Sequence, residues 1–142
     1  MNLTFREKSL WLLFVSLTLV FGLYFASALP AQVADIAPTN VMTFVGMLIL
    51  LIAIQIVGHI VLAISSRREL ASRVQKDERD TLISLKSTRL ASCILVAGVF
   101  CSIWTALLVP GNFAFVHVLL AFWVLAQAAE ILSQLILYRR GV

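Results

Sequence analysis

Five polar side chains within the apolar parts of the sequence have the types and spacing to do chemistry. Gln127, Glu130 and Gln134 follow i, i+3, i+7 spacing, which places them on one face of a helix. Gln55 and His59 are four residues apart and share a face of another helix. An acid and an imidazole inside a membrane bundle can carry a proton or bind a cationic ligand. We therefore expect the two faces to meet, with His59 and Glu130 paired directly or through water.

The same residues also fit a structural role as hydrogen-bonding groups between helices. Gln and His side chains contribute about 0.6–2 kcal/mol per contact between transmembrane helices. The presence of Glu130 favours a functional site over a structural role. A charge at the bilayer centre costs at least ~2.5–3.5 kcal/mol, so charged residues within membrane spans are usually functional. No metal site and no other cofactor are expected, since the second histidine, His117, lies near the far end of its apolar run and receives no role. No nucleophile with a partnering base is recognisable, so we expect no enzyme.

The composition predicts the elements that must position these residues. The chain is 61% hydrophobic and 13% charged, with mean hydropathy +1.01, as in membrane proteins. Four apolar runs, at about residues 10–29, 41–65, 90–109 and 113–138, are each long enough to cross a ~30 Å hydrocarbon core. The first run also resembles a signal peptide, but its length favours a retained helix. We expect one all-α domain, an integral membrane bundle of four transmembrane helices.

The basic residues predict how the chain is threaded. All eleven Lys and Arg precede the first run, lie between the second and third, or follow the fourth. The other two links carry none, and one of them holds Asp35. The positive-inside rule then places both termini and segment 66–89 in the cytoplasm, with two hairpins joined by this segment. The net charge of +4 is suited to anionic lipid rather than nucleic acid.

The charged segment 66–89 ends in a predicted helix start. Asp77 is placed to cap the helix and acids fill its first turn, so the third transmembrane helix is expected to extend beyond the apolar run at Leu90. This extension is either a solvated helix that contacts anionic lipid or a docking surface for a protein partner. Its candidate interaction residues are Asp77, Glu78, Arg79, Asp80, Lys86 and Arg89.

Small and aromatic residues carry expectations about packing. Cys93 and Cys101 are expected to be buried small apolar residues, too far apart for a disulfide. Tyr24 lies near the end of a run, where amphipathic rings meet the membrane interface. Close helix packing is expected at the glycines within the runs, namely Gly22, Gly46, Gly58 and Gly98.

Three short motifs carry a resemblance. The opening FREKSLW, the central DERDTLISLKSTRL and the closing LILYRRGV resemble uncharacterised small bacterial four-span inner-membrane proteins. Those proteins share an EK-x-x-W opening, a DER[DE]-x-x-I junction and a YRRG finish. The resemblance implies the four-span fold and a location in the bacterial inner membrane, and it implies no activity or site residue.

The functional expectation is a small integral membrane protein without enzymatic activity. It would act as an accessory or regulatory subunit that binds a cytoplasmic or membrane protein partner at its cytoplasmic face. Self-association into a homo-oligomer is also expected, because small residues and wide apolar faces allow further copies to pack. The alternative is a small proton-coupled transporter or ligand-binding bundle that uses Glu130.

Overall fold

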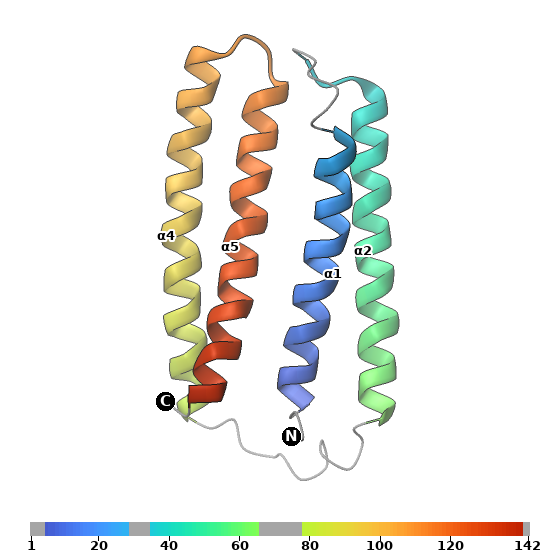
Figure 1. Cartoon of the computed structure of the whole chain (residues 1–142), viewed down its shortest axis with the longest axis vertical. Helices are drawn as coiled ribbons and strands as arrows, with labels where there is room; N and C mark the ends of the chain where they lie inside the picture. The colour runs from blue at the N-terminus through green and yellow to red at the C-terminus, as the bar shows by residue number, and fades with distance from the viewer. Residues whose placement is uncertain (1–4, 29–34, 66–77, 141–142) are drawn as a thin grey trace.

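The protein is all-α in the part of the chain that its computed structural model describes, residues 5–28, 35–65 and 78–140. Helix α1 spans Phe5–Ala28, α2 Pro38–Ser65, α4 Glu78–Leu108 and α5 Phe113–Arg140 (Figure 1). All four helices are long and apolar enough to cross a membrane, which is the pattern of a multi-pass membrane protein. The four predicted runs are thus confirmed as helices, and the predicted extension of the third is confirmed from Glu78 onward.

Local sequence explains where the helices begin and turn. Pro38 occupies the first turn of α2, where its missing N–H costs nothing, and Ala37 accepts bonds from the N–H groups of Asn40 and Val41. The predicted link, which ran to Asn40, is therefore three residues too long. Gly111 adopts a φ of 87° in the turn between α4 and α5, a conformation that glycine adopts without strain.

The helices pack as two hairpins joined through their inner helices. The principal contacts are α1 with α2, α4 with α5, and α1 with α5. Figure 1 accordingly shows the order α4, α5, α1, α2, with neighbouring helices running in opposite directions. The first residue of α1 and the last residue of α5 lie at one end, which we call the terminal end; the start of α2 and the turn between α4 and α5 lie at the other, the turn end. The pairs α1–α2 and α4–α5 thus pack side by side.

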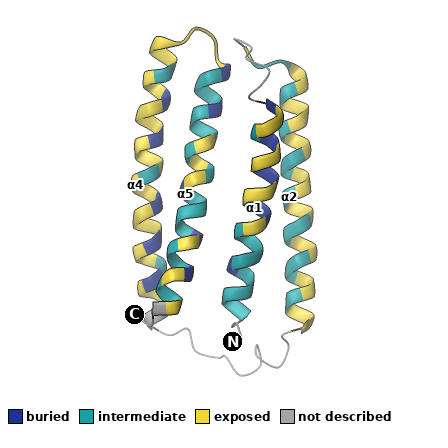
Figure 2. Ribbon diagram, viewed as in Figure 1, coloured by how far each residue is buried: buried dark blue, intermediate teal, exposed yellow. Residues whose placement is uncertain are grey.

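The core lies around α1, which, like α5, has a neighbouring helix on each of two sides. Val20 and Phe21 are almost inaccessible, and the α1 side chains pack against Ile131 and Leu135 of α5. Helix α2 has no buried residue (Figure 2). Many of its aliphatic side chains are exposed, among them Ile49, Ile52 and Ile60, which suits contact with lipid tails but would be costly in water.

The packing expectations were correct at two glycines and wrong at two. A Cβ at Gly98 would collide with Phe122, and one at Gly58 would collide with Leu12. Gly22 and Gly46 face open space, so neither allows a close contact with another described helix.

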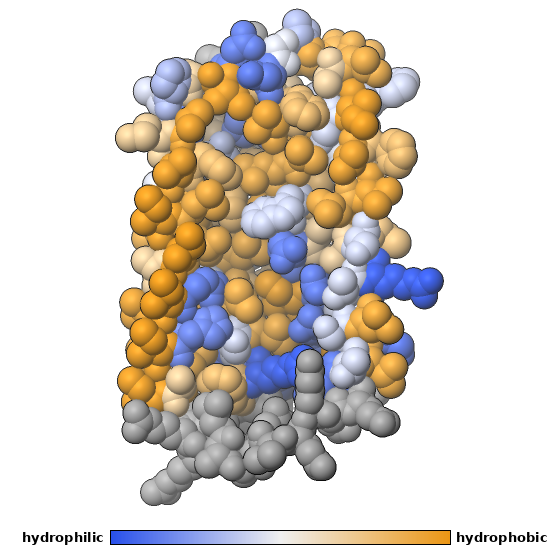
Figure 3. Space-filling model, turned by 180° about the vertical axis from the view of Figure 1, so that it is seen from behind, coloured by the Kyte–Doolittle hydropathy of each residue, from blue (hydrophilic) through white to orange (hydrophobic). Residues whose placement is uncertain are grey.

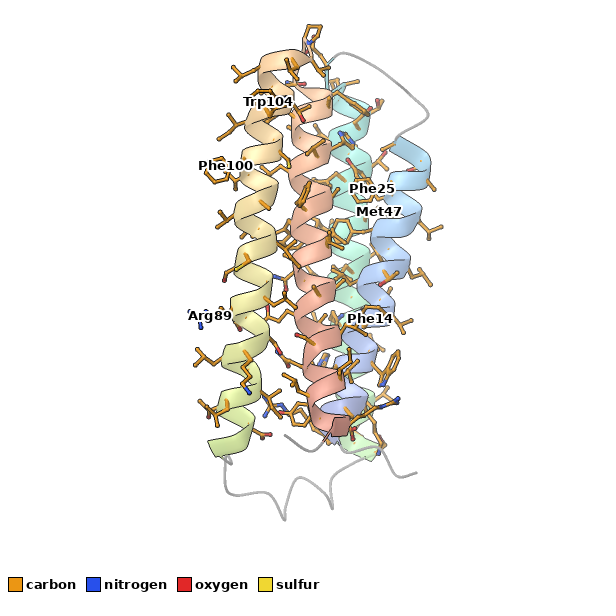
Figure 4. The ribbon with its side chains drawn as sticks, turned by 60° about the vertical axis from the view of Figure 1, so that its left-hand side comes forward. Phe14, Phe25, Met47, Arg89, Phe100 and Trp104 are labelled. Atoms are coloured by element: carbon orange, nitrogen blue, oxygen red, sulfur yellow. The ribbon has the colours of Figure 1, made fainter. Side chains whose placement is uncertain are left out.

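The predicted burial of the cysteines is wrong. Cys93 and Cys101 are both exposed. Helix α4 packs chiefly against α5, so most of its circumference has no neighbour among the other described helices. Phe100 and Trp104 point outward from the same helix (Figure 4).

A pair of backbone–side-chain bonds joins the two hairpins at the turn end. The Ile36 N–H donates to Oδ1 of Asn112 at 2.8 Å, and the Asn112 N–H donates to Oδ1 of Asp35 at 3.3 Å. The bonds connect the link before α2 to the turn before α5. The hairpins are therefore fixed to each other at this end as well as along the α1–α5 contact.

Candidate functional site

Polar side chains form a ladder between α1 and α2. Ser9 Oγ lies 2.9 Å from Nε2 of His59, whose Nδ1 lies 2.8 Å from the Gln55 carbonyl oxygen. Because a carbonyl only accepts, Nδ1 carries a hydrogen and Nε2 of the neutral ring accepts from Ser9. Gln55 Nε2 donates to Ser16 Oγ at 2.5 Å, while its buried Oε1 has no hydrogen-bond partner. These bonds tie α2, the helix with no buried residue, to the core helix.

Glu130 belongs to the other hairpin. Thr88 of α4 donates to its Oε1 at 2.7 Å. His59 bonds to α1 instead, so the expected direct pair of His59 and Glu130 is wrong. The physical reason is the helix order: Glu130 lies on the flank of α5 that reaches α4, whereas α2 packs chiefly against α1. The five predicted polar residues are divided between two helix pairs.

Gln127, Glu130 and Gln134 form a polar stripe on one flank of α5, as their spacing predicts. All three are half-buried. Neither glutamine side chain makes a hydrogen bond with any residue the structure describes. Figure 3 shows hydrophilic side chains on this side of the molecule, between α2 and α4, in the half nearer the terminal end. The stripe therefore lines an open face rather than a closed interior.

The depth of the polar stripe follows from the helix rise. Gln127 and Glu130 come fourteen and seventeen residues after Phe113, the first residue of α5. At 1.5 Å per residue they lie ~21 and ~26 Å from the turn end, within a ~30 Å hydrocarbon core, and Gln134 lies near its edge. An amide that faces hydrocarbon without a hydrogen bond is costly, by several kcal/mol in alkane-like surroundings. The stripe thus has unused hydrogen-bonding capacity where lipid tails cannot satisfy it.

A charged cluster joins three helices at the terminal end. Arg6 of α1 forms an ion pair with Asp80 of α4 at 2.6 Å, and Tyr138 of α5 donates to the other Asp80 oxygen at 2.8 Å. The Arg6 guanidinium also lies over the Tyr138 ring, 5.2 Å from its centre. Asp80 and Tyr138 are each eight residues from the Thr88–Glu130 bond, as an antiparallel pair in constant register requires. We call this the Arg6–Asp80–Tyr138 cluster.

The cluster gives Asp80, at the end of the charged segment, a structural role. Its carboxylate binds one side chain of α1 and one of α5, and so joins these helices to α4. It comes from the DERD motif, while Arg6 comes from FREK and Tyr138 from YRRG, so the three motifs that carry the resemblance meet in space. No pattern within any one motif could indicate this contact, because its members are separated by 74 and 58 residues in the sequence.

Two of the other predicted interaction residues, Lys86 and Arg89, are described and do not join the cluster. Asp77 lies outside the described residues, as do the side chains of Glu78 and Arg79. Lys86 and Arg89 are exposed, and Arg89 points away from the other helices (Figure 4). Among the described residues no three His, Cys, Asp or Glu side chains come close enough together to hold a metal ion.

A recess of about 280 Å³ opens between the Arg6–Asp80–Tyr138 cluster and the Thr88–Glu130 bond. The basic and acidic groups of the cluster lie at one end of it, and hydroxyl groups of α4 continue toward the other. Its lining residues are Arg6, Asp80, Thr81, Ser84, Leu85 and Thr88. The recess therefore combines a cation, an anion, three hydroxyl groups and one apolar side chain.

His117 and Tyr24 form a buried pair near the turn end. The Tyr24 hydroxyl lies 3.0 Å from Nε2 of His117, and Nδ1 of His117 lies 2.8 Å from the Phe113 carbonyl oxygen. The two rings stack with their centres 5.7 Å apart. Tyr24 is 4% exposed, so the expected interface position is wrong for this ring. The polar atoms are satisfied, and the pair joins α1 to α5.

No family model, curated protein or solved structure matches this chain. Among the described residues, the polar stripe and the recess have hydrogen-bonding groups that no other described residue satisfies.

Proposed function

We propose that this protein is a non-enzymatic accessory or regulatory protein of the bacterial inner membrane. Its function would be to bind a transmembrane helix of a partner protein against the polar stripe of α5. The distribution of basic residues supports a cytoplasmic position for the terminal end, so the stripe would face the partner in the cytoplasmic half of the bilayer.

The observation that carries this proposal is the unused hydrogen-bonding capacity of Gln127 and Gln134. Glu130 forms one bond, to Thr88, and the two amides form none within the described chain. In hydrocarbon, a second helix that offers polar side chains is the partner best able to satisfy them. The opposite flank of α5 carries exposed Leu125, whose apolar side chain can contact lipid tails and requires no hydrogen-bond partner.

The transporter alternative makes a different demand on Glu130. A coupling group must lose and regain a proton, whereas a partner-binding residue needs only to form hydrogen bonds. The charge-neutral variant Glu130→Gln retains hydrogen-bonding atoms. We therefore expect it to retain partner binding, whereas a transporter would lose pH-dependent ligand binding in the same variant.

Co-purification from native membranes in a mild detergent tests the proposal. The double variant Gln127→Leu, Gln134→Leu removes two contacts of at least about 0.6 kcal/mol each, so partner recovery should fall close to tenfold. The control Leu125→Ala changes the opposite flank and should leave recovery unchanged. The proposal fails if the double variant recovers the same partner as the unaltered chain. Recovery of a second copy of this chain would identify the partner as a homo-oligomer.

A further inference from the structure

The recess beside the Arg6–Asp80–Tyr138 cluster lies at the depth of phospholipid headgroups. Thr88, at one end of the recess, is twenty residues from Leu108 at the turn end of α4, or ~30 Å along the helix. This distance equals the thickness of the hydrocarbon core. Asp80, at the other end, lies ~12 Å further toward the terminal end. The recess therefore begins at the edge of the hydrocarbon and extends through the headgroup layer.

The Arg6 guanidinium, the cation at the recess, has N–H donors that the ion pair does not use. A guanidinium carries five N–H donors, and the ion pair with Asp80 is made through Nη1 of Arg6. Arg6 remains about one third exposed. Arginine binds phosphate in a forked, two-bond geometry, and the hydroxyl groups of Thr81 and Ser84 are further donors along the same wall. A phosphate group thus has a natural position beside Arg6.

The anion at the recess excludes a simple phosphate site. Asp80 lies against Arg6 and would repel a free phosphate dianion. Its carboxylate offers about four acceptor positions, of which Arg6 and Tyr138 occupy two. The remaining positions, together with the hydroxyl oxygens of α4, suit an ammonium group. A paired positive and negative charge is complementary to a zwitterion.

We propose that the recess binds the headgroup of an amine-bearing zwitterionic phospholipid, with its phosphate on Arg6 and its primary ammonium at Asp80. Leu85 supplies an apolar contact for the glycerol and upper acyl chain. The bilayer supplies this ligand at the right depth and high local concentration. The proposal uses side chains of α1 and α4, whereas the partner helix is proposed to bind the glutamines of α5; the two sites adjoin at the Thr88–Glu130 bond.

Native mass spectrometry of the full chain in detergent tests the proposal with defined lipids. Phosphatidylethanolamine should remain bound at least about fivefold more than phosphatidylcholine, whose methylated ammonium has no N–H donor for Asp80. Phosphatidylglycerol, which lacks the ammonium, should also bind less. Equal retention of the three lipids would overturn the proposal. Equal occupancy by inorganic phosphate would overturn it too, by showing that the recess binds phosphate alone.

Variants of the recess wall provide the second arm. Ser84→Leu fills the recess and Thr81→Val removes a hydroxyl, while both leave the ion pair of Arg6 and Asp80 intact. Each should lower phosphatidylethanolamine retention, Ser84→Leu about fivefold or more. The control Lys86→Ala removes an exposed charge that does not line the recess and should have no effect. Unchanged retention in Thr81→Val and Ser84→Leu together would show that the lipid binds elsewhere.

Discussion

The ion pair of Arg6 and Asp80 should stabilise the fold by coupling the two hairpins. A hydrogen bond to a charged group contributes about 1.5–3 kcal/mol, and exposed pairs contribute about 0.2–1 kcal/mol. The side chains are 31% and 20% exposed, which places this pair between those limits. We therefore expect a coupling free energy of about 1–2 kcal/mol between Arg6→Ala and Asp80→Ala in a double-mutant cycle.

Reversible unfolding in mixed micelles, followed by helical circular dichroism, measures the free energy of each variant. Asp80→Ala should be more destabilising than Arg6→Ala, because it also removes the acceptor of the Tyr138 hydroxyl. The coupling should decrease in 1 M salt, where the screening length falls to ~3 Å. Arg89→Ala is the control, since this exposed side chain points away from the bundle. A coupling below about 0.3 kcal/mol would refute the reasoning, because sites that do not interact are additive within that error.

Three further predictions concern other contacts. Gly98→Ala forces a Cβ against the Cβ of Phe122 and should destabilise the protein by about 1–3 kcal/mol in the same unfolding assay, whereas Gly46→Ala faces open space and should be neutral or slightly stabilising. Equal effects of the two glycine variants would contradict the described α4–α5 packing. Tyr24→Phe leaves a buried imidazole nitrogen without its partner and should cost about 1–3 kcal/mol; a neutral result would count against that buried pair. Asn112→Ala removes the turn-end bond that its side chain accepts from Ile36 and should cost about 0.5–1.5 kcal/mol, and no loss would show that this bond does not hold the hairpins together.

The four helices could be predicted from the sequence because each consists of a run that exceeds the thickness of a bilayer. Within a membrane, the backbone must satisfy its own hydrogen bonds, so a long apolar run has one available structure. The polar stripe followed from the same regularity, since i, i+3, i+7 spacing fixes a face once the helix is given. Helix ends are harder to predict from hydropathy: the apolar run begins at Val41, whereas α2 begins at Pro38, because proline fits the first turn of a helix.

The partners of the polar residues could not be predicted, because helix order is not encoded in periodicity. His59 and Glu130 lie at similar depth in the sequence, yet one bonds to α1 and the other to α4. Arg6 and Asp80 are separated by 74 residues, and nothing in either motif specifies the other. The prediction that the cysteines are buried was wrong for the same reason. Helix α4 has one main neighbour, and composition does not reveal how many neighbours a helix has.

Site-specific photo-crosslinking tests the central proposal, that a partner helix binds along the polar stripe. A photoreactive amino acid at position 127 should give a crosslinked product of one defined mass in native membranes. The same amino acid at position 125, on the opposite and exposed flank of α5, should react with lipid and give no such product. The product at position 127 should also weaken when Gln134 is changed to Leu. Equal crosslinking at both positions, or none at position 127, would contradict the account.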